Sequence, residues 1–471
     1  MNRRDFVKTV TAGVGGISVL GAHAQNKASG KKPLRIAVIG CGHRGVRTLL
    51  AESCKEQVVA VADPDPKRIK AALARVHEVT PSADVSKIRT FPDYHPLFEQ
   101  MGDEIDAVIV ATCNHHHAPA ALMAMKRGIH VYVEKPLTHT IHEARQLRDA
   151  AKKYGVVTQM GNHGHSNEGA RRLCEYIWAG AIGQVREVHC WTTRCNGLPS
   201  GYVSPDLPLP EGMDWKSWIG PAPFRKFHDD LHPHNWHLWT DFGNGSVGNM
   251  ACHIIDPSYW ALRLEAPEAV EVESMRGGGN GTWPISTRIR FDFPARGNMS
   301  PVKLYWYDGL KDGVEYSQKT VQKRWRSTNK RKYQNIPPIT RELEKKYDRN
   351  FGTNGSVLIG DEGYMTIGEF GEACRIVPEK AHRAFPMPAK QLPRVKGTHQ
   401  EDFFKACHNG TQACSNFDYA VPLAEFPLLG NLAILAGEKR RVEWDSKAMR
   451  CTNIPELNKY LKQPYQNGWT A

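Results

Sequence analysis

The sequence predicts an α/β protein whose N-terminal part is a parallel sheet covered by helices on both faces. A run of branched apolar residues at 34–39, LRIAVI, leads directly into glycines at positions 40, 42 and 45, as a strand buried on both faces leads into a tight turn. A second apolar run ends at Asp63. Apolar runs and helical patterns then alternate as far as residue 160, and such alternation builds a parallel sheet with right-handed crossovers.

Gly40, Gly42 and Gly45 form the motif G-x-G-x-x-G. The first glycine allows the turn, the second lets the backbone approach a pyrophosphate, and the third permits close packing of helix on strand. Asp63 follows Gly45 by 18 residues, where a carboxylate accepts hydrogen bonds from both ribose hydroxyls. We therefore expect a Rossmann domain that binds NAD, with His43 and Arg44 of the motif also at the cofactor. The carboxylate repels a 2′-phosphate and thus disfavours NADP.

The same patterns predict the other elements of this domain. We expect strands at 57–65, 88–91, 105–112, 130–136 and 156–160, and helices at 66–77, after Asp93, at 119–127 and at 141–153. The carboxyl ends of parallel strands meet at one edge of the sheet, where ligands bind. We assign to the cofactor the polar residues at that edge, which are Thr112, Asn114, His117, Glu134 and Lys135.

The first 24 residues have the pattern of a twin-arginine export signal. Arg3 and Arg4 precede an apolar run to Leu20 and a small-residue exit at 22–24, with cleavage expected after Ala24. A membrane anchor is the alternative, but the run falls short of the ~20 residues that span a bilayer. This export route carries folded proteins, so we expect a periplasmic or exported enzyme that captures NAD in the cytoplasm and holds it tightly.

Composition is that of a globular enzyme. The chain has 471 residues, of which 41% are hydrophobic, enough for two domains. We find no further apolar run long enough to span a membrane. The lysines and arginines behind the net charge of +13 are dispersed, except for a dense cluster at Lys323–Lys332. We interpret this cluster as a solvated loop or an oligomer contact, so no nucleic-acid partner is expected. None of the eleven cysteines is in a C-x-x-C pair, and Cys41, Cys113 and Cys252 are expected to be reduced and buried.

Five segments together resemble the Gfo/Idh/MocA family of oxidoreductases. They are AVIGCGHRG, ADPDP, the T-x-N-H-x-H pattern from Thr112, Glu134-Lys135-Pro136 and GNMACHIID at 248–256. The resemblance covers roughly residues 33–465 and is strongest to exported members with QMGNHGH at 159–165 and W-x-x-W-x-G-P-A-P from Trp215. It implies an NAD-binding Rossmann domain at 33–160 and a C-terminal α+β domain at 161–440 with a large, mostly antiparallel open sheet. It also implies a homo-oligomer, either a dimer or a tetramer. We expect residues 1–24 to be the signal and residues 441–471 to be a C-terminal extension.

The C-terminal half alternates as sheet strands do at 270–276, 287–293 and 303–309. Further strands are expected at 355–359, 363–367 and 374–378, a helix at 399–406, and a helical segment from residue 416 to Gly437. No catalytic role is assigned to this half beyond residue 256.

Proton transfer is assigned to Lys135 and His253. Oxidation of an alcohol needs a base for the hydroxyl proton, and the family resemblance gives Lys135 the role of hydrogen-bonding the reacting hydroxyl. Asn249 and His253 are four residues apart and share one helix face. Many family members have aspartate at the first position, as part of an acid/base pair. Asn249 cannot act as a base, so we expect it to hydrogen-bond the substrate or the ring of His253, which leaves His253 to transfer the proton.

Other aromatic and histidine residues are candidates for sugar binding. Trp236, Trp239 and Asp241 precede the predicted catalytic helix, and aromatic faces stack on sugar rings, although core packing is an equal interpretation for each tryptophan. We expect His163 and His165 to line the sugar pocket, and His117 to touch the nicotinamide. None of the histidine clusters has the spacing of a recognised zinc site, so no metal is expected.

Three functions remain open. The first is an NAD-dependent oxidoreductase that acts on a hydroxyl or keto group of a sugar or glycoside. The second is a redox-neutral glycosidase, since a Gly-Asn pair before a histidine also resembles the NAD-dependent α-N-acetylgalactosaminidases of glycoside hydrolase family 109; the chain lacks the Tyr-Pro-Thr run of that group. The third is a nucleotide-bound sensor, against which Lys135 and His253 count, because binding alone requires no ionisable pair.

Overall fold

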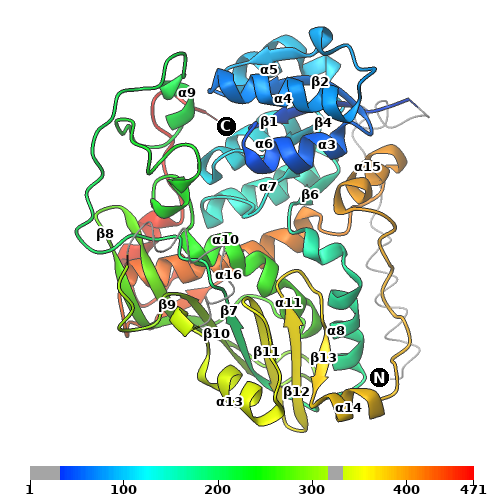
Figure 1. Ribbon diagram of the computed structural model, residues 1–471, viewed down its shortest axis with the longest axis vertical. Coiled ribbons are helices and arrows are strands. Elements are labelled where there is room, and N and C mark those ends of the chain that lie inside the picture. Colours follow the sequence, from blue (N-terminus) through cyan, green and yellow to red (C-terminus); the bar gives the residue numbers. More distant parts are fainter. Residues whose placement is uncertain (1–31, 317–331, 471) are drawn as a thin grey trace.

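The computed structural model describes residues 32–316 and 332–470. They form two domains, each with its own sheet, and Figure 1 shows the smaller sheet with its helices at the top and the larger sheet below. The expected signal at 1–24 lies outside the described residues, as does nearly all of the basic segment Lys323–Lys332.

The N-terminal sheet is parallel throughout. Its six strands follow the order β3-β2-β1-β4-β5-β6, and β4 and β5 are fully buried. The strands are β1 Arg35–Ile39, β2 Gln57–Ala62, β3 Arg89–Phe91, β4 Ala107–Val110, β5 His130–Val133 and β6 Thr158–Met160. The strand order reverses between β1 and β4, which opens the crevice where a doubly wound fold binds its ligand. The predicted Rossmann domain is confirmed.

The helices of this domain lie close to the predicted ranges, with one exception. They are η1 Gly45–Leu50, α3 Ala51–Ser53, α4 Pro66–Val79, η2 Val85–Lys87, α5 Tyr94–Met101, η3 Gly102–Glu104, α6 Asn114–Met125 and α7 Ile141–Tyr154. The prediction that α6 begins at Pro119 is wrong. The helix begins five residues earlier, because nearly all of its side chains are buried and tertiary packing outweighs the backbone hydrogen bond that Pro119 removes.

The C-terminal sheet has nine strands in the order β13-β12-β11-β7-β10-β9-β8-β14-β15. All neighbours are antiparallel except β7 and β10, so the mostly antiparallel sheet that the resemblance implied is confirmed. The strands are β7 Val185–Trp191, β8 Ala269–Gly279, β9 Thr282–Phe293, β10 Val302–Gly309, β11 Gly355–Gly360, β12 Gly363–Gly368, β13 Arg375–Val377, β14 Val442–Asp445 and β15 Arg450–Cys451.

Helices separate this sheet from the Rossmann domain, as Figure 1 shows for α10 and α16. The elements are η4 His163–Ser166, α8 Glu168–Trp178, α9 Trp215–Ile219, η5 Asn235–Leu238, α10 Gly245–Ile254, α11 Asp256–Ala261, α13 Pro338–Tyr347, α14 Glu379–Ala384, α15 His399–Asn409, α16 Phe417–Ala436 and η7 Pro455–Tyr460. Helix α16 contacts α7, α10 and β8 and so joins the two domains.

Helix α16 corrects one expectation about apolar runs. Among the described residues it alone is long and apolar enough to cross a membrane, but 78% of its apolar window is buried inside the protein. The burial of α16 is that of a core helix. The extension expected from residue 441 also differs, since β14 and β15 within it continue the sheet beside β8. All eleven cysteines are free, and Cys41, Cys113 and Cys252 are buried, as predicted.

Candidate active site

The glycine loop after β1 is shaped for close approach of backbone and ligand. Gly40 has a φ of +92°, and a Cβ there would lie 2.5 Å from the carbonyl oxygen of Ala111. A Cβ at Gly45 would lie 2.1 Å from the carbonyl oxygen of Gly40. At Gly42 it would meet only the end of the Arg68 side chain, at 3.1 Å. The first and third glycines are therefore required by packing, whereas the second leaves an open face for a pyrophosphate.

Asp63 lies at the carboxyl end of β2, beside this loop. Its Oδ2 accepts a hydrogen bond from the Cys41 amide at 2.7 Å, and its Oδ1 accepts one from the Asp65 amide at 2.9 Å. Burial raises the pKa of Asp63 to about 6. Each oxygen keeps a lone pair for a further donor, and a cavity of about 90 Å³ adjoins them, lined also by Gly40, Gly42 and Thr112. The carboxylate is thus placed to receive ribose hydroxyls.

Asn114 adds a second indication of a ligand here. Its side chain is only 1% exposed, and within the described part of the chain neither its amide oxygen nor its amide nitrogen has a hydrogen-bond partner. A buried amide without partners costs free energy unless something else satisfies it. Asn114 opens α6 directly after β4, at the ligand-binding edge of the sheet. The glycine loop, Asp63 and Asn114 together fit a dinucleotide.

His117 differs from its expected role at the nicotinamide. Its Nδ1 lies 2.8 Å from the carbonyl oxygen of Pro136, and its Nε2 lies 3.2 Å from that of Thr112. Both nitrogens therefore face backbone, and the ring bridges the ends of β4 and β5. Sequence alone did not reveal this bridge, because it depends on α6 beginning at residue 114.

Arg44 and Glu134 connect the glycine loop to the next part of the site. The Arg44 Nε donates to Glu134 Oε1 at 3.0 Å, and Arg44 also lies 3.4 Å from His163 Nδ1. Burial acts to raise the pKa of Glu134, but the charges of Arg44 and Lys135 hold it below its usual value. Glu134 is therefore a buried carboxylate that fixes Arg44, while the neighbouring His43 is exposed.

Lys135 and Asn249 form the centre of the site. The Lys135 Nζ donates to Asn249 Oδ1 at 2.7 Å and to the Asn249 carbonyl oxygen at 3.0 Å. Burial lowers the pKa of Lys135. Of the partners expected for Asn249, the described residues show no hydrogen bond to the Nδ1 of His253; the amide oxygen of Asn249 accepts from Lys135. Lys135 keeps one N–H for a third acceptor.

His253 lies one turn further along α10, as its spacing predicted. Its ring centroid is 5.1 Å from that of His163, and among the described residues its Nδ1 has no hydrogen-bond partner. Burial, and then the charge of Lys135, hold the pKa of His253 well below its usual value. His253 is therefore a neutral imidazole at physiological pH, as a proton acceptor must be.

Phe370, Glu369 and Arg194 also belong to this region, and sequence reasoning missed them. The Phe370 ring centroid is 4.6 Å from that of His163 and 5.0 Å from that of His253. Burial raises the pKa of Glu369, while the charge of Arg194 opposes this rise. Glu369 and Phe370 follow β12, and Arg194 follows β7. Only the pairing of strands in the sheet brings these residues near Lys135, and no local sequence motif marks them.

Two residues expected at the sugar pocket are held elsewhere. His165 is 2% exposed, and its Nδ1 lies 3.1 Å from both carboxylate oxygens of Asp256, so it belongs to the core below α11. Trp239 is 4% exposed and donates to the Asp230 carbonyl oxygen at 3.1 Å, which supports the core-packing interpretation.

Trp236 and Asp241 also have other neighbours than a sugar. Trp236 lines the cavity beside Asp63. Asp241 accepts hydrogen bonds from the Arg225 guanidinium at 2.7 and 2.9 Å. Trp236 therefore borders the nucleotide cavity, and Asp241 is held by Arg225. His163 lies beside His253, and its place in a sugar pocket stays a prediction.

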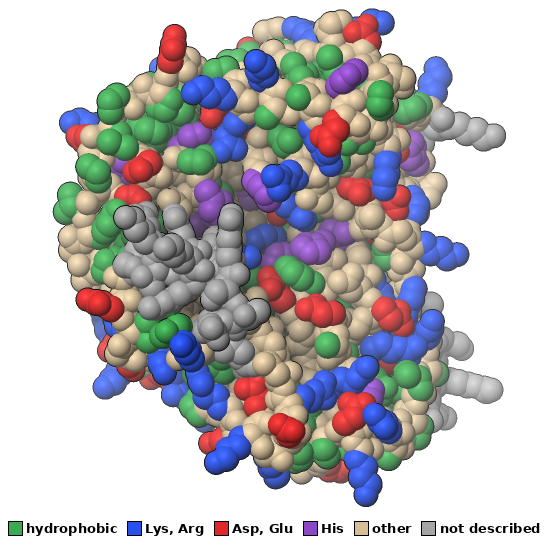
Figure 2. Space-filling view, in the orientation of Figure 1, with side chains coloured by type: hydrophobic (Ala, Val, Ile, Leu, Met, Phe, Trp, Pro, Cys, Tyr) green, Lys and Arg blue, Asp and Glu red, His purple; other side chains and the backbone are tan. Residues whose placement is uncertain are grey.

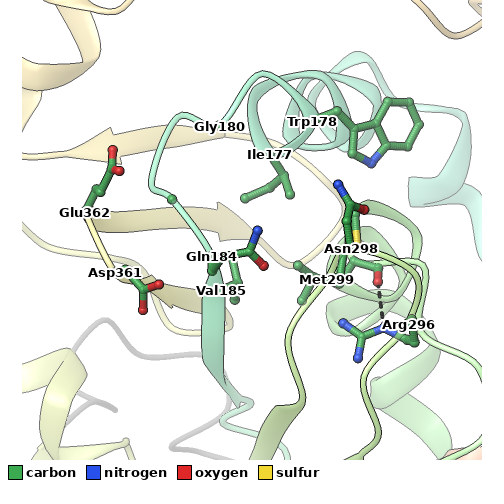
Figure 3. A pocket seen from close by; sticks show the side chains of 12 residues that line it. Ile177, Trp178, Gly180, Gln184, Val185, Arg296, Asn298, Met299, Asp361 and Glu362 are labelled. Carbon is green, nitrogen blue, oxygen red and sulfur yellow. Dashed lines mark hydrogen bonds between the residues drawn. The ribbon is translucent and has the colours of Figure 1, made fainter. Parts of the chain in front are cut away.

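The cavity of greater volume does not lie at the site formed by Lys135, Asn249 and His253. Figure 2 shows a hollow near the middle of one face, with histidine and Lys or Arg side chains around it. A different cavity of about 380 Å³, drawn in Figure 3, lies between the end of α8 and the turns that carry Met299 and Glu362. Glu362 precedes β12, whereas Glu369 and Phe370 follow it, so the length of this strand separates that cavity from His253. In residues 32–316 and 332–470 no group of three or more His, Cys, Asp or Glu is arranged to hold a metal ion.

Comparison with known families agrees with both domains. Residues 34–162 match the model of the oxidoreductase family with NAD-binding Rossmann fold, and residues 196–290 match that of the oxidoreductase family C-terminal alpha/beta domain. The N-terminal domain is thus of the NAD-binding class. Both matched models are models of the Gfo/Idh/MocA oxidoreductases, the family that the sequence resembles.

Curated relatives match over part of their length. Inositol 2-dehydrogenase of Pseudomonas fluorescens is 32% identical over 161 residues, which are 33% of this chain and 45% of that protein. Levoglucosan dehydrogenase of Pseudarthrobacter phenanthrenivorans is 26% identical over 266 residues, 52% of this chain and 58% of that protein. D-glucoside 3-dehydrogenase of Escherichia coli is 26% identical over 183 residues, 38% and 49% respectively. The chain spans about half the length of the curated relatives it matches.

Solved structures share the fold at lower identity. The WlbA dehydrogenase from Bordetella pertussis, in complex with NADH and UDP-GlcNAcA, has a TM-score of 0.56 and 13% identity over 88% of this chain and 99% of that one. The aldose-aldose oxidoreductase from Caulobacter crescentus, complexed with glycerol, has a TM-score of 0.53 and 16% identity over 88% and 100%. These likenesses establish the two-domain architecture.

Proposed function

We propose that the protein is an NAD-dependent oxidoreductase that oxidises a hydroxyl group, or reduces the matching keto group, of a sugar, polyol or glycoside. One observation carries the proposal. Lys135 is fixed by Asn249, and a neutral His253 lies one turn further along α10, beside a glycine loop and Asp63 that fit a dinucleotide. A protein that only binds its ligand does not require a lysine ammonium group next to a neutral imidazole.

The residues divide the proton work between them. The remaining N–H of Lys135 hydrogen-bonds the oxygen of the reacting alcohol and stabilises negative charge as it develops there. The neutral imidazole of His253 accepts the hydroxyl proton. NAD, when bound, supplies the acceptor for the hydride that leaves the carbon. The C–H bond breaks, the C=O bond forms, and the proton remains on His253 until solvent removes it.

The substrate class is drawn from the relatives and the site. Inositol, levoglucosan and D-glucosides appear in the names of the relatives, and all carry secondary hydroxyls on a saturated ring. His163 and Phe370 provide an aromatic wall next to His253, which suits the C–H face of such a ring. We propose a cyclic polyol or sugar ring as substrate.

The direct test is reduction of NAD by the purified protein with myo-inositol, levoglucosan and methyl glucosides. We expect reduced nicotinamide with at least one of them, formed about 10²-fold more slowly by His253→Ala. Absence of nicotinamide reduction with every ring alcohol, in protein that has bound NAD, would contradict the proposal.

A redox-neutral glycosidase is the second candidate. It is favoured by Asn249, since the chain has Gly248-Asn249 before His253 where many family members have aspartate. Oxidation, elimination, hydration and re-reduction would release a sugar without net use of NAD. Many turnovers of an aryl glycoside without added NAD would favour this candidate, whereas a single turnover or none would exclude it.

Export and assembly complete the proposal. Arg3, Arg4 and the exit at Ala24 support twin-arginine export to the periplasm of a protein already loaded with NAD, and the family resemblance supports a dimer or tetramer. Lysine at both arginine positions should leave the precursor in the cytoplasm. Mature, NAD-loaded protein in the periplasm of that variant would contradict export by this route.

A further inference from the structure

The last residues of the chain lie against the nucleotide-binding side of the Rossmann domain. After η7 the chain runs from Leu461, whose carbonyl oxygen accepts a hydrogen bond from the His142 amide at 3.1 Å, to Trp469. On the way the Tyr465 hydroxyl donates to Glu143 Oε1 at 3.1 Å. Figure 1 shows this red segment rising from the lower domain to the upper one. It therefore joins the two domains, as α16 also does.

Trp469 ends this crossing against an aromatic cluster. Its ring centroid lies 4.4 Å from that of His95, 5.3 Å from that of Tyr94 and 5.4 Å from that of His116. Tyr94 and His116 line the cavity that also contains Asp63. Trp469 thus supports the outer side of residues whose inner side faces the expected adenosine half of NAD.

The same segment holds the loop that follows α9, a helix that lines this cavity. The side-chain Nδ2 of Asn467 donates to the carbonyl oxygens of Gly220 and Ala222, each at 2.8 Å. The backbone N–H of Gln466 donates to the carbonyl oxygen of Pro221 at 3.0 Å. Gly220 directly follows α9, whose Trp218 also lines the cavity.

His116 connects the two anchoring points. Its Nε2 lies 2.9 Å from the carbonyl oxygen of Trp218, and a Cβ at Gly220 would lie 2.0 Å from its ring. The contact between α9 and α6 is therefore tight, and the C-terminal segment braces it from outside.

We infer that residues 461–470 form a C-terminal latch that keeps the α9 loop closed over NAD and makes the release of the nucleotide slow. This inference rests on the proposed function, because it assumes that NAD occupies the cavity beside Asp63. Opening the α9 loop requires that Asn467 and Gln466 leave the backbone of 220–222, or that Trp469 leaves its cluster. Both steps expose apolar or hydrogen-bonding groups that are covered in the closed form.

The test measures nucleotide release rather than turnover. Protein loaded with NADH is mixed with excess NAD, and the loss of bound NADH fluorescence gives the release rate. Trp469→Ala and Asn467→Ala should each raise this rate about tenfold or more, since the first removes the ring contacts and the second the side-chain hydrogen bonds that hold the closed form. Thr470→Ala, next to Trp469 but exposed, is the matched control and should release NADH at the wild-type rate.

Hydrogen exchange on the unmodified protein gives a second measurement, independent of any effect of a substitution on folding. Coupling is reciprocal, so bound NADH should slow exchange at the amides of 461–470 and 220–222. Unchanged release rates in both alanine variants, or equal exchange of the latch with and without NADH, would overturn the inference. Wild-type protein that binds no NADH at all would instead contradict the proposed function, so the two failures are distinguishable.

Discussion

Lys135 donates both to the side-chain oxygen and to the carbonyl oxygen of Asn249, at 2.7 and 3.0 Å. The ammonium group is therefore fixed at the start of the turn that ends in His253. The side-chain amide of Asn249 offers Lys135 the same kind of oxygen acceptor that an aspartate at this position would offer. We therefore propose that Asn249 positions a cation and moves no proton.

The first prediction concerns Lys135. Lys135→Ala removes the donor to the reacting oxygen and should lower turnover by about 10²-fold or more, the range of general acid–base groups. NAD should remain bound, because the glycine loop and Asp63 are untouched. Turnover and the bound nucleotide are measured on the same preparation. Wild-type turnover in Lys135→Ala would remove this residue from the mechanism.

Asn249 allows a paired test of positioning. Asn249→Asp keeps the oxygen and should retain measurable activity, with the pKa of Lys135 raised because a carboxylate at this distance favours the ammonium form. The pH profile should shift accordingly to higher pH. Asn249→Ala removes the shorter of the two hydrogen bonds that fix Lys135 and should lower kcat more than it changes KM. Equal kcat and KM for the two variants would show that the side-chain oxygen of Asn249 does not position Lys135.

Asp63 predicts how NAD affinity depends on pH. Its pKa is about 6 because of burial, and backbone amides and the charge of Arg68 limit the rise. Ribose hydroxyls donate to the carboxylate, so the ionised form binds NAD better, and affinity is lost as pH falls through that pKa. One pH unit below it, NAD should bind about tenfold more weakly. Equilibrium titration checks this, and Asp63→Asn should give a flat profile.

Asp63 also governs the choice of nucleotide. Asp63→Ala removes the acceptor for the ribose hydroxyls and the charge that repels a 2′-phosphate, while Arg68 remains at the cavity. We expect weaker NAD binding and a smaller difference between NAD and NADP, measured as two dissociation constants. Stronger discrimination against NADP in the variant would contradict the role given to this carboxylate.

The parts of the fold that depend on local pattern were predictable from the sequence. The branched runs at β1 and β4 and the glycines between β1 and α3 define a Rossmann domain without further information. The start of α6 was not predictable, because Pro119 disfavours a helix locally and burial overrides it. Length and apolarity likewise do not distinguish α16 from a membrane span; only its burial does.

The site was predictable where a motif places residues and not where pairing does. Lys135, Asn249 and His253 come from two short segments, and the spacing of four residues on α10 put the latter two on one face. Phe370 reaches His253 only through the order of the nine-stranded sheet. His165 illustrates the opposite error: it is two residues from His163, yet the short helix η4 turns it into the core toward Asp256.

The measurement that tests the central claim most directly is a single turnover of NAD-loaded protein with a ring alcohol, followed by the absorbance of reduced nicotinamide. The account predicts that the wild-type protein forms reduced nicotinamide and a ketone in equal amounts. His253→Ala should do so about 10²-fold more slowly with its NAD still bound. Reduced nicotinamide forming at the wild-type rate in His253→Ala would contradict the account, because the neutral imidazole next to Lys135 would then not be the proton acceptor.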